Sequence, residues 1–495
     1  MNGKIAYSSS ARAFRPYSLC CGLRVFHQIA GQSVHHGVAS SLSNASTAYQ
    51  FEKMKRSASS ISKATPRVKK PGLQIPEYHL TPSVRDEAGE IIWPAPRKQI
   101  DRAREFILEC AAAQKKTLIV PDKDADGLSS GVILQKTLII LGLEPELVSV
   151  HFLQKGSNVH NESERNAMAA YEPAFIIVLD HGSRKSPPLI DAQHRALVID
   201  HHWALADHFP QGSDYVTACH SPPVATSSLL TYYICSGLDE KVQSSCDWLC
   251  VMGTQGDLGS SLKWDAPFPD MRSTFKTYTK KAITDAVPLI NAPRRTATYE
   301  VPAAWTALAT ADSPKDLLQN STLLAARAEV AAEVRRCARA PPKFSSDGKI
   351  AVIRLKSTAQ IHPVIATRWA GHLKSPRLEA ILVANHGYIP GMVHFSCRVP
   401  RSARGRDPPV SLIEILEGIA ARAPDPTLKE RLGGSFANGH KEASGGIVPE
   451  AEFDELLSIM GVGKVATGSP EKLKKEAAPK QSNTLTNYFD KQKVA

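Results

Sequence analysis

Aspartate and histidine side chains gather in four short segments, each beside a run of apolar residues. These residue types bind divalent cations and activate water, so the four segments are candidates for chemistry. The acids at alternating positions, Asp124 and Asp126, can reach two ions from one loop, and Gly127 permits a tight turn into a following helix. The segments are Asp122-Lys-Asp124-Ala-Asp126-Gly127, Asp180-His-Gly182, Asp200-His201-His202 and Gly256-Asp257.

Three of these segments directly follow an apolar run that we expect to be a buried strand, at 117–120, 175–179 and 196–199. In an open parallel sheet, ligand sites lie outside the carboxyl ends of the strands, so the three sets of acids should meet at one edge. Asp257, expected on a helix, can close the cluster. Carboxylates that lie close together raise one another's pKa, and divalent cations supply the compensating charge. Carboxylate with imidazole suits Mn²⁺, and Mg²⁺ is also possible.

Each segment taken alone has a simpler interpretation. The Asp-x-Asp-x-Asp-Gly run is also found in calcium loops, but no Glu stands at the twelfth position that an EF-hand requires. Asp180 alone could cap a helix, and His201 and His202 alone could be surface residues. The arrival of all four segments at strand or helix ends favours a metal site.

The surrounding elements alternate between strand and helix, which predicts an α/β fold with a parallel sheet. Continuous apolar strands fit a sheet that is covered on both faces. A helical stretch at 303–340 would join this domain to a smaller α/β domain, with a cleft between the two. The other expected elements are helices at 99–113 and 127–141 and strands at 147–152, 350–355, 380–384 and 391–399.

The 495 residues are too many for a single core and divide by composition into five parts. We expect a disordered or targeting extension at 1–93, a catalytic domain at 94–302, a helical linker at 303–345, a second domain at 346–462 and a disordered tail at 463–495. The tail is rich in Lys with Pro and Ser, a composition that does not support a core.

Bulk composition narrows the class of protein. The net charge of +12 favours acidic partners, nucleic acid first among them, although a basic tail on a neutral enzyme gives the same sum. The nine cysteines contain no C-x-x-C pair, so zinc-ribbon spacing is absent. No apolar run approaches the roughly 18–20 residues of a membrane helix, so we expect no membrane partner.

The motifs together resemble the DHH phosphoesterase superfamily, and most of all its RecJ-type nucleases, over residues 117–449. Asp200-His201-His202 is the motif that gives the family its name. Three further elements are similar to RecJ-like ones: Asn291-Ala-Pro-Arg294 to an Asn-Ala-x-x-Arg element, Ser396-Cys-Arg398 to a Ser-x-Arg strand, and 438–446 to the glycine-rich signature of the DHH-associated C-terminal domain. In that signature Gly439, His440 and Gly445 are kept, while Asn438 and Ser444 depart from it.

The resemblance implies roles for individual residues. Two Mn²⁺ ions, or Mg²⁺, would be held by Asp124, Asp126, Asp180, His201 and Asp257. Asp200 would orient the histidines, and His202 would face the phosphate together with Arg398. Asn291, Arg294, Ser396, Arg398, Gly439, His440 and Gly445 would bind substrate.

Phosphodiester hydrolysis by two metals is the activity that this set implies. A single-strand-specific exonuclease acting in DNA replication or repair is the first hypothesis, with single-stranded nucleic acid as the partner. A short-oligonucleotide or nucleotide phosphatase, or a polyphosphatase, is the second. A non-catalytic replication scaffold is the third.

The two ends of the chain indicate different locations. The first 51 residues lack Asp and Glu and contain Arg and Ser, which is typical of mitochondrial transit peptides, and Met54 offers an alternative start. The tail segment with Leu485, Tyr488 and Phe489 resembles a peptide that binds the sliding clamp PCNA, which predicts a nuclear location. The sequence leaves both the nucleus and the mitochondrion open.

Overall fold

The computed structural model of the protein describes residues 82–463, apart from the side chains of Asn438 and His440. The extension up to residue 81 and the tail from residue 464, with its clamp-binding-like peptide, lie outside these residues. Trp93 donates its indole N–H to the carbonyl of Pro223 at 2.9 Å and packs edge-on against Tyr233 and Phe268. The residues just before 94 therefore pack with the domain that follows them.

The first domain is built on the expected parallel sheet, in the strand order β2-β1-β3-β4-β5. All four neighbouring pairs are parallel, and the strands predicted at 117–120, 175–179 and 196–199 are present. The strand expected at 147–152 is shorter, and β5 was not expected, because its first three residues are only half-buried. The strands are β1 (Thr117–Pro121), β2 (Val148–Val150), β3 (Phe175–Leu179), β4 (Arg195–Asp200) and β5 (Ser213–Thr217).

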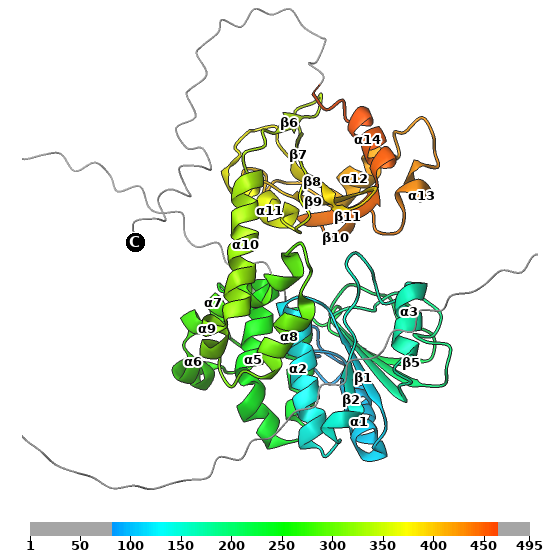
Figure 1. Ribbon diagram of the computed structural model, residues 1–495, viewed down its shortest axis with the longest axis vertical. Helices are drawn as coiled ribbons and strands as arrows, with labels where there is room; N and C mark the ends of the chain where they lie inside the picture. The colour runs from blue at the N-terminus through cyan, green and yellow to red at the C-terminus, as the bar shows by residue number, and fades with distance from the viewer. Residues whose placement is uncertain (1–81, 464–495) are drawn as a thin grey trace, which may run out of the picture. The chain divides into compact units, whose positions relative to one another are not determined.

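Both faces of this sheet are covered, which explains why its central strands are apolar throughout. One face carries Ile119, Ile177 and Ile199 against α1, α2, α4 and α5. The other face carries Val120, Val178 and Val198, with Met168 of α3 in the same core. Figure 1 shows α2 and α5 on one side of the strands and α3 on the other. These helices are α1 (Arg97–Ala113), α2 (Ala125–Ile140), α3 (Glu162–Ala169), α4 (Ser227–Ser236) and α5 (Glu240–Leu258).

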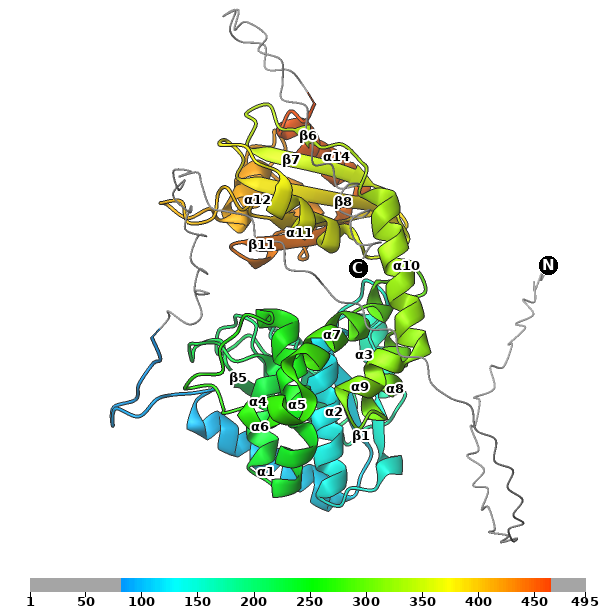
Figure 2. The same ribbon diagram turned by 90° about the vertical axis from the view of Figure 1, so that its left-hand side faces the viewer.

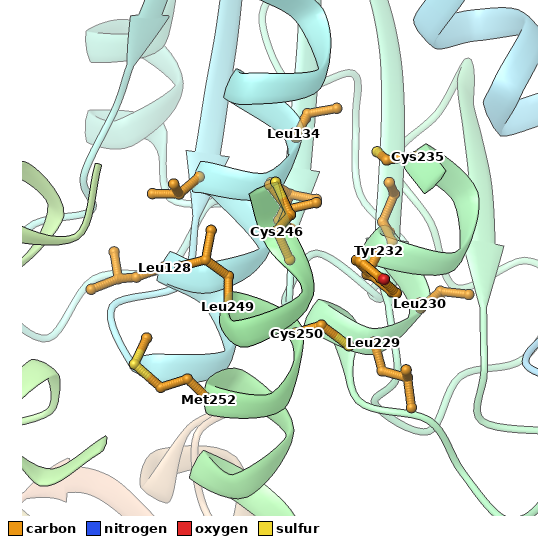
Figure 3. Packing of buried hydrophobic residues seen from close by; sticks show 14 of the residues in the cluster. Leu128, Leu134, Leu229, Leu230, Tyr232, Cys235, Cys246, Leu249, Cys250 and Met252 are labelled. Atoms are coloured by element: carbon orange, nitrogen blue, oxygen red, sulfur yellow. The ribbon is translucent and has the colours of Figure 1, made fainter. Parts of the chain in front are cut away.

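Helices α2, α4 and α5 pack closely against one another through buried hydrophobic side chains (Figure 3). Leucines and cysteines fill the space between them, among them Leu128, Leu249 and Cys250. A Cβ on Gly253 would lie 2.3 Å from the hydroxyl of Ser228, so only glycine fits where α5 crosses the start of α4. The close approach brings the end of α5 to the carboxyl edge of the sheet.

The helical stretch predicted at 303–340 consists of three helices. Ser313 and Asp316 form a capping box that starts the second helix, and Asn320 caps the third by accepting from the amide of Leu323. The helices between α5 and the second domain are α6 (Arg272–Tyr278), α7 (Lys280–Ile290), α8 (Val301–Ala309), α9 (Pro314–Gln319) and α10 (Ser321–Cys337), with a short turn η3 (Pro293–Arg295). Leu323 of α10 belongs to the first core, and Val330 and Val334 belong to a core of the second domain. Helix α10 is therefore the linker between two cores.

The second domain is a six-stranded mixed sheet in the order β10-β11-β9-β8-β7-β6, in which only β7 and β8 are parallel. Helix α11 covers one face, and α12 and α14 cover the other (Figure 2). Helix α13 packs in the same core as α12 and α14. Its elements are β6 (Lys343–Phe344), β7 (Ile350–Leu355), α11 (His362–His372), β8 (Ala380–Ile389), β9 (Met392–Arg398), α12 (Leu412–Ala420), α13 (Leu428–Leu432), β10 (Asn438–His440), β11 (Ala443–Pro449) and α14 (Glu450–Ile459). No helix in the described part of the chain has the length and apolar character needed to cross a membrane.

Candidate metal centre

The loop from β1 to α2 places three acids at the carboxyl edge of the sheet. Asp124 is the N-cap of α2, and its carboxylate accepts from the amides of Asp126 and Gly127 at 3.1 and 3.3 Å. A Cβ on Gly127 would lie 2.6 Å from the carbonyl oxygen of Asp122, so this turn requires glycine. The expected tight turn is therefore present, and close backbone packing is its physical cause.

Asp126 is completely buried and is held by the first turn of α4. Its carboxylate accepts from the amide of Ser227 at 2.8 Å, from the amide of Ser228 at 3.1 Å and from the Ser228 hydroxyl. Amides at a helix N-terminus have no partner within the helix, so they favour a carboxylate there. We did not identify these serines from sequence, although Thr226-Ser-Ser before an apolar run is a helix-start signal.

Asp180 directly follows β3, has a left-handed backbone with φ +66°, and is buried. Its carboxylate accepts from the hydroxyl of Ser227 at 2.8 Å. A non-glycine residue in this conformation carries strain, and such residues occur most often at functional sites. The neighbouring His181, also not identified from sequence, contacts the carbonyl of Val120 through Nε2 at 3.0 Å. Ser227 thus ties Asp126 and Asp180 together.

Asp200 is buried at the end of β4 and orients the two histidines that follow it. One of its carboxylate oxygens accepts from the backbone amides of His201 and His202, at 2.8 and 3.2 Å, and lies 2.8 Å from Nδ1 of His202. The other oxygen accepts from the amide of Ser183. Burial opposes the charge, but His202 and these donors lower the pKa of Asp200 below its usual range. Asp200 therefore stays ionised and fixes the ring of His202.

His201 lies between acids from two different elements. Its Nε2 atom is 3.3 Å from Oδ1 of Asp180 and 3.3 Å from Oδ2 of Asp257, which lies in the last turn of α5. That nitrogen is buried and has no hydrogen-bond partner within residues 82–463. The helix predicted to carry Asp257 to the cluster is confirmed.

The cluster carries more negative charge than its protein neighbours balance. Burial, followed by Asp257 and Asp124, raises the pKa of Asp126 to about 6. Burial and Asp126 raise the pKa of Asp180 well above its usual value. Burial also raises the pKa of Asp122, but Lys123, His181 and Arg294 outweigh it and hold that pKa at about 2. Asp126 and Asp180 therefore ionise together only when a positive charge lies close to both, as a bound cation would.

The ligand atoms fit divalent ions. Three overlapping groups have their ligand atoms within 4.8 Å of one another: Asp180, His201 and His202; Asp126, His201 and Asp257; and Asp122, Asp124 and Asp180. Bonds of about 2.1 Å to one ion separate two ligand atoms by about 3.0 Å at a right angle and about 3.4 Å at the tetrahedral angle. The 3.3 Å spacings around His201 Nε2 match this range.

The predicted substrate-binding residues come from two regions. Arg294 donates from Nε to Asn291 at 3.0 Å and lies 3.6 Å from the carboxylate of Asp124, beside the acids. In β9, Arg398 donates to the hydroxyl of Ser396 at 2.9 Å. Burial, Arg294 and Arg398 lower the pKa of Arg295 to about 9, so Arg398 lies near this segment.

The glycine-rich signature forms the hairpin β10–β11 beside β9. Gly445 pairs with Ser396, and a Cβ there would lie 2.5 Å from the carbonyl oxygen of Phe395. Gly439 has φ +119°, a conformation that favours glycine, and His440 pairs with Ala443. The glycines are explained by close strand packing, and substrate binding by this hairpin stays a prediction.

Residues 116–254 match a family described as the DHH family, N-terminal domain. This span holds the β1–α2 loop, Asp180 and the Asp200-His201-His202 motif. Asp257 lies just beyond the match and completes the cluster of this DHH domain.

Two solved structures show the same fold as the chain. RecJ from Thermus thermophilus, solved with Mn²⁺, is 18% identical with a TM-score of 0.53 over 75% of this chain and 55% of its own. A DHH domain described as part of a member of a family of ribosomal proteins is 13% identical with a TM-score of 0.54 over 74% of this chain and 90% of its own. The chain thus spans about half the length of the Thermus RecJ. Comparison with curated proteins gives no match.

Proposed function

We propose that the protein is a divalent-metal-dependent phosphodiesterase that removes nucleotides from an end of single-stranded nucleic acid. The observation that carries the proposal is the buried Nε2 of His201, which lies 3.3 Å from carboxylate oxygens of both Asp180 and Asp257 without hydrogen-bond geometry to any residue between 82 and 463. A buried imidazole and several carboxylates around one point form a ligand set for divalent ions rather than a structural ion pair.

Two Mn²⁺ ions are the proposed cofactors, and Mg²⁺ is the alternative. Bound ions supply a water of lowered pKa as the nucleophile and neutralise charge that develops on the phosphate. Asp124, Asp126, Asp180, His201 and Asp257 are the proposed ligands. Asp122 is an added candidate, because its carboxylate groups with Asp124 and Asp180.

The remaining residues have roles that follow from their contacts. His202 is half-exposed and held by Asp200, so its ring can donate to a phosphate oxygen. Arg294, beside Asp124, adds positive charge at the edge of the acids. Arg398 is mostly buried, and burial lowers its pKa because the charged guanidinium is poorly solvated there. A bound phosphate would supply a counter-charge and stabilise the ionised side chain.

Polymeric nucleic acid is the proposed substrate because the motifs of the acid cluster resemble those of RecJ-type nucleases. The net charge of +12 comes from the segments before residue 82 and after residue 463, which could attract the phosphate backbone to the protein. Short oligonucleotides, nucleotides and polyphosphate are the competing substrates. The intact acid cluster supports turnover and weighs against a non-catalytic scaffold.

A nuclease assay tests the proposal directly. Purified protein is incubated with 5′- or 3′-labelled single strands, with the matching duplex, with dinucleotides and with polyphosphate, in Mn²⁺, in Mg²⁺ and in EDTA. We expect release of nucleotides from the long single strand in Mn²⁺ and none in EDTA. Asp180→Ala and His201→Ala should abolish release while keeping the circular dichroism of the wild type. Hydrolysis in EDTA, or by either variant, contradicts the proposal.

We also propose that the tail binds the sliding clamp PCNA through Leu485, Tyr488 and Phe489, which would place the protein in DNA replication or repair in the nucleus. The support is the sequence of the tail alone. Immobilised PCNA should retain the full chain and lose it when Tyr488→Ala and Phe489→Ala are combined. Equal retention of the two proteins would exclude the peptide as the binding segment.

A further inference from the structure

A tryptophan next to the DHH motif is largely exposed. Trp203 directly follows His202, and 68% of its surface is accessible, the highest value among the large hydrophobic side chains of residues 82–463. Leu205, two residues further on, is 48% exposed. Tryptophan is highly buried on average, so an exposed indole beside a candidate active site indicates a binding role.

The backbone on both sides of Trp203 is held in place, so the exposure does not come from a loose loop. Before it, the amide and ring of His202 bond to Asp200. After it, Ala204 is buried and its carbonyl lies 2.7 Å from Nε2 of His220. The indole itself meets the edge of the His208 ring, with 6.2 Å between ring centroids. A ring held in this way needs little ordering when a ligand binds.

The indole also lies close to the proposed chemistry. His202 belongs to a ligand group with Asp180 and His201, and the Cα atoms of neighbouring residues are about 3.8 Å apart. The strands β3 and β4 are adjacent, and the loops that follow them are joined by an ion pair of Lys185 with Asp207 at 3.1 Å. Trp203 therefore lies in a loop at the carboxyl edge of the sheet, directly after a candidate metal ligand.

Positive charge is present in the neighbouring loop. Arg184 lies in the loop that follows β3, is exposed, and forms no ion pair with any residue between 82 and 463. Its neighbour Ser183 donates its amide to Asp200. The Arg184 guanidinium lies beside Gly434, with its nitrogens 3.5 and 4.0 Å from where a Cβ of that residue would be. In single-strand binding sites bases stack on aromatic rings and phosphates meet cations, so both Trp203 and Arg184 are candidates for contact with the substrate.

We infer that Trp203 is a stacking platform for the base of a nucleotide that flanks the scissile phosphate. The inference rests on the proposed function and narrows its substrate class to substrates that carry nucleobases, because pyrophosphate and polyphosphate have no base to stack. Trp203 is a specificity-determining residue in this account, and the metal ligands are untouched by its replacement. The loss of one base–aromatic stack is expected to lower kcat/KM by about 5- to 150-fold.

The test combines two changes, one in the protein and one in the substrate. The proteins are wild type, Trp203→Ala and Trp203→Phe, with Leu324→Ala on α10 as a control at another exposed apolar side chain, 45% accessible. The substrates are a labelled single strand and the same strand with one abasic nucleotide, placed in turn at each of the terminal positions. For each pair, kcat/KM is measured in Mn²⁺.

We expect Trp203→Ala to lower kcat/KM on the normal strand by about 5- to 150-fold and Trp203→Phe to restore most of it. At one position, an abasic nucleotide should lower wild-type kcat/KM by a similar factor and have no further effect in Trp203→Ala. Leu324→Ala should match wild type throughout.

Three results would overturn the stacking role. The first is wild-type kinetics in Trp203→Ala, which is expected of a surface for another protein. The second is a loss of kcat/KM in Trp203→Ala that is as large on every abasic strand as on the normal strand. This result would indicate a structural role for the indole. The third is an equal effect of base removal in both proteins.

The failure of this inference can be distinguished from the failure of the proposed function. If the wild type cleaves no strand, the proposed function fails and this inference fails with it. Cleavage by the wild type together with any of the three results removes only the inference.

Discussion

Ser227→Ala is expected to weaken metal binding without disturbing the fold. The Ser227 hydroxyl donates to Asp180 at 2.8 Å, and its backbone amide donates separately to Asp126 at 2.8 Å. Alanine removes only the first of these bonds. A hydrogen bond to a charged group contributes about 1.5–3 kcal/mol, so the dissociation constant of Mn²⁺ should rise by about 10- to 150-fold.

The pH dependence separates this positioning role from a general loss of structure. The hydroxyl stabilises the ionised form of Asp180, so its removal raises the pKa of that carboxyl further. Protons then compete better with Mn²⁺, and the difference between variant and wild type should grow as the pH falls and shrink as it rises.

Calorimetric titration with Mn²⁺ at several pH values measures both effects. Ser129→Ala is the matched control, because the Ser129 hydroxyl is equally buried but has no hydrogen-bond partner in the part of the chain that the structure describes. It should bind Mn²⁺ as the wild type does. Ser227→Thr, which keeps a hydroxyl, should recover part of the affinity. Wild-type affinity in Ser227→Ala at every pH would refute the reasoning.

Three further predictions concern charge. Asp180→Asn removes one of several facing negative charges. In urea, the free energy of unfolding of the metal-free protein should therefore rise by about 1–3 kcal/mol, while Mn²⁺ binding is lost. A variant with the stability of the wild type would show that the acids do not repel one another. Burial, with Lys123 and Lys155, lowers the pKa of His394 to about 3, so the unfolded chain binds the extra proton below pH 6.5. Between pH 6.5 and 5 the wild type should therefore lose about 2 kcal/mol relative to His394→Asn, and parallel stability curves would contradict this. Arg294→Ala should lower kcat/KM on single strands by about 10- to 100-fold, because it removes the cation beside Asp124. The kcat/KM of Arg294→Lys should lie between those of the wild type and Arg294→Ala. Unchanged kinetics in Arg294→Ala would exclude a role of this residue in phosphate binding.

The meeting of the acids could be predicted from the sequence because it follows from sheet geometry. Asp124, Asp180 and Asp200 each follow an apolar strand, and parallel strands bring their carboxyl ends to one edge. The helix that brings Asp257 to this edge was expected from the sequence, but only the packing of α5 on α2 and α4 explains why it reaches His201.

The residues that hold the acids could not be predicted in the same way. Ser227 is 101 positions from Asp126, and nothing local in either segment indicates their contact. Strand β5 was missed because its first three residues are only half-buried, so its pattern lacks the continuous apolar run of the central strands. The exposure of Trp203 likewise depends on the loop that holds it, and its position after His202 is all that can be read from the sequence.

The positions of bound metal ions test the central claim most directly. Crystals grown with Mn²⁺ and measured near the manganese absorption edge should show two anomalous peaks among Asp124, Asp180, His201 and Asp257, with one of them bonded to Nε2 of His201. Crystals of His201→Ala should lose that peak. Saturating Mn²⁺ with no anomalous peak at these side chains would contradict the account.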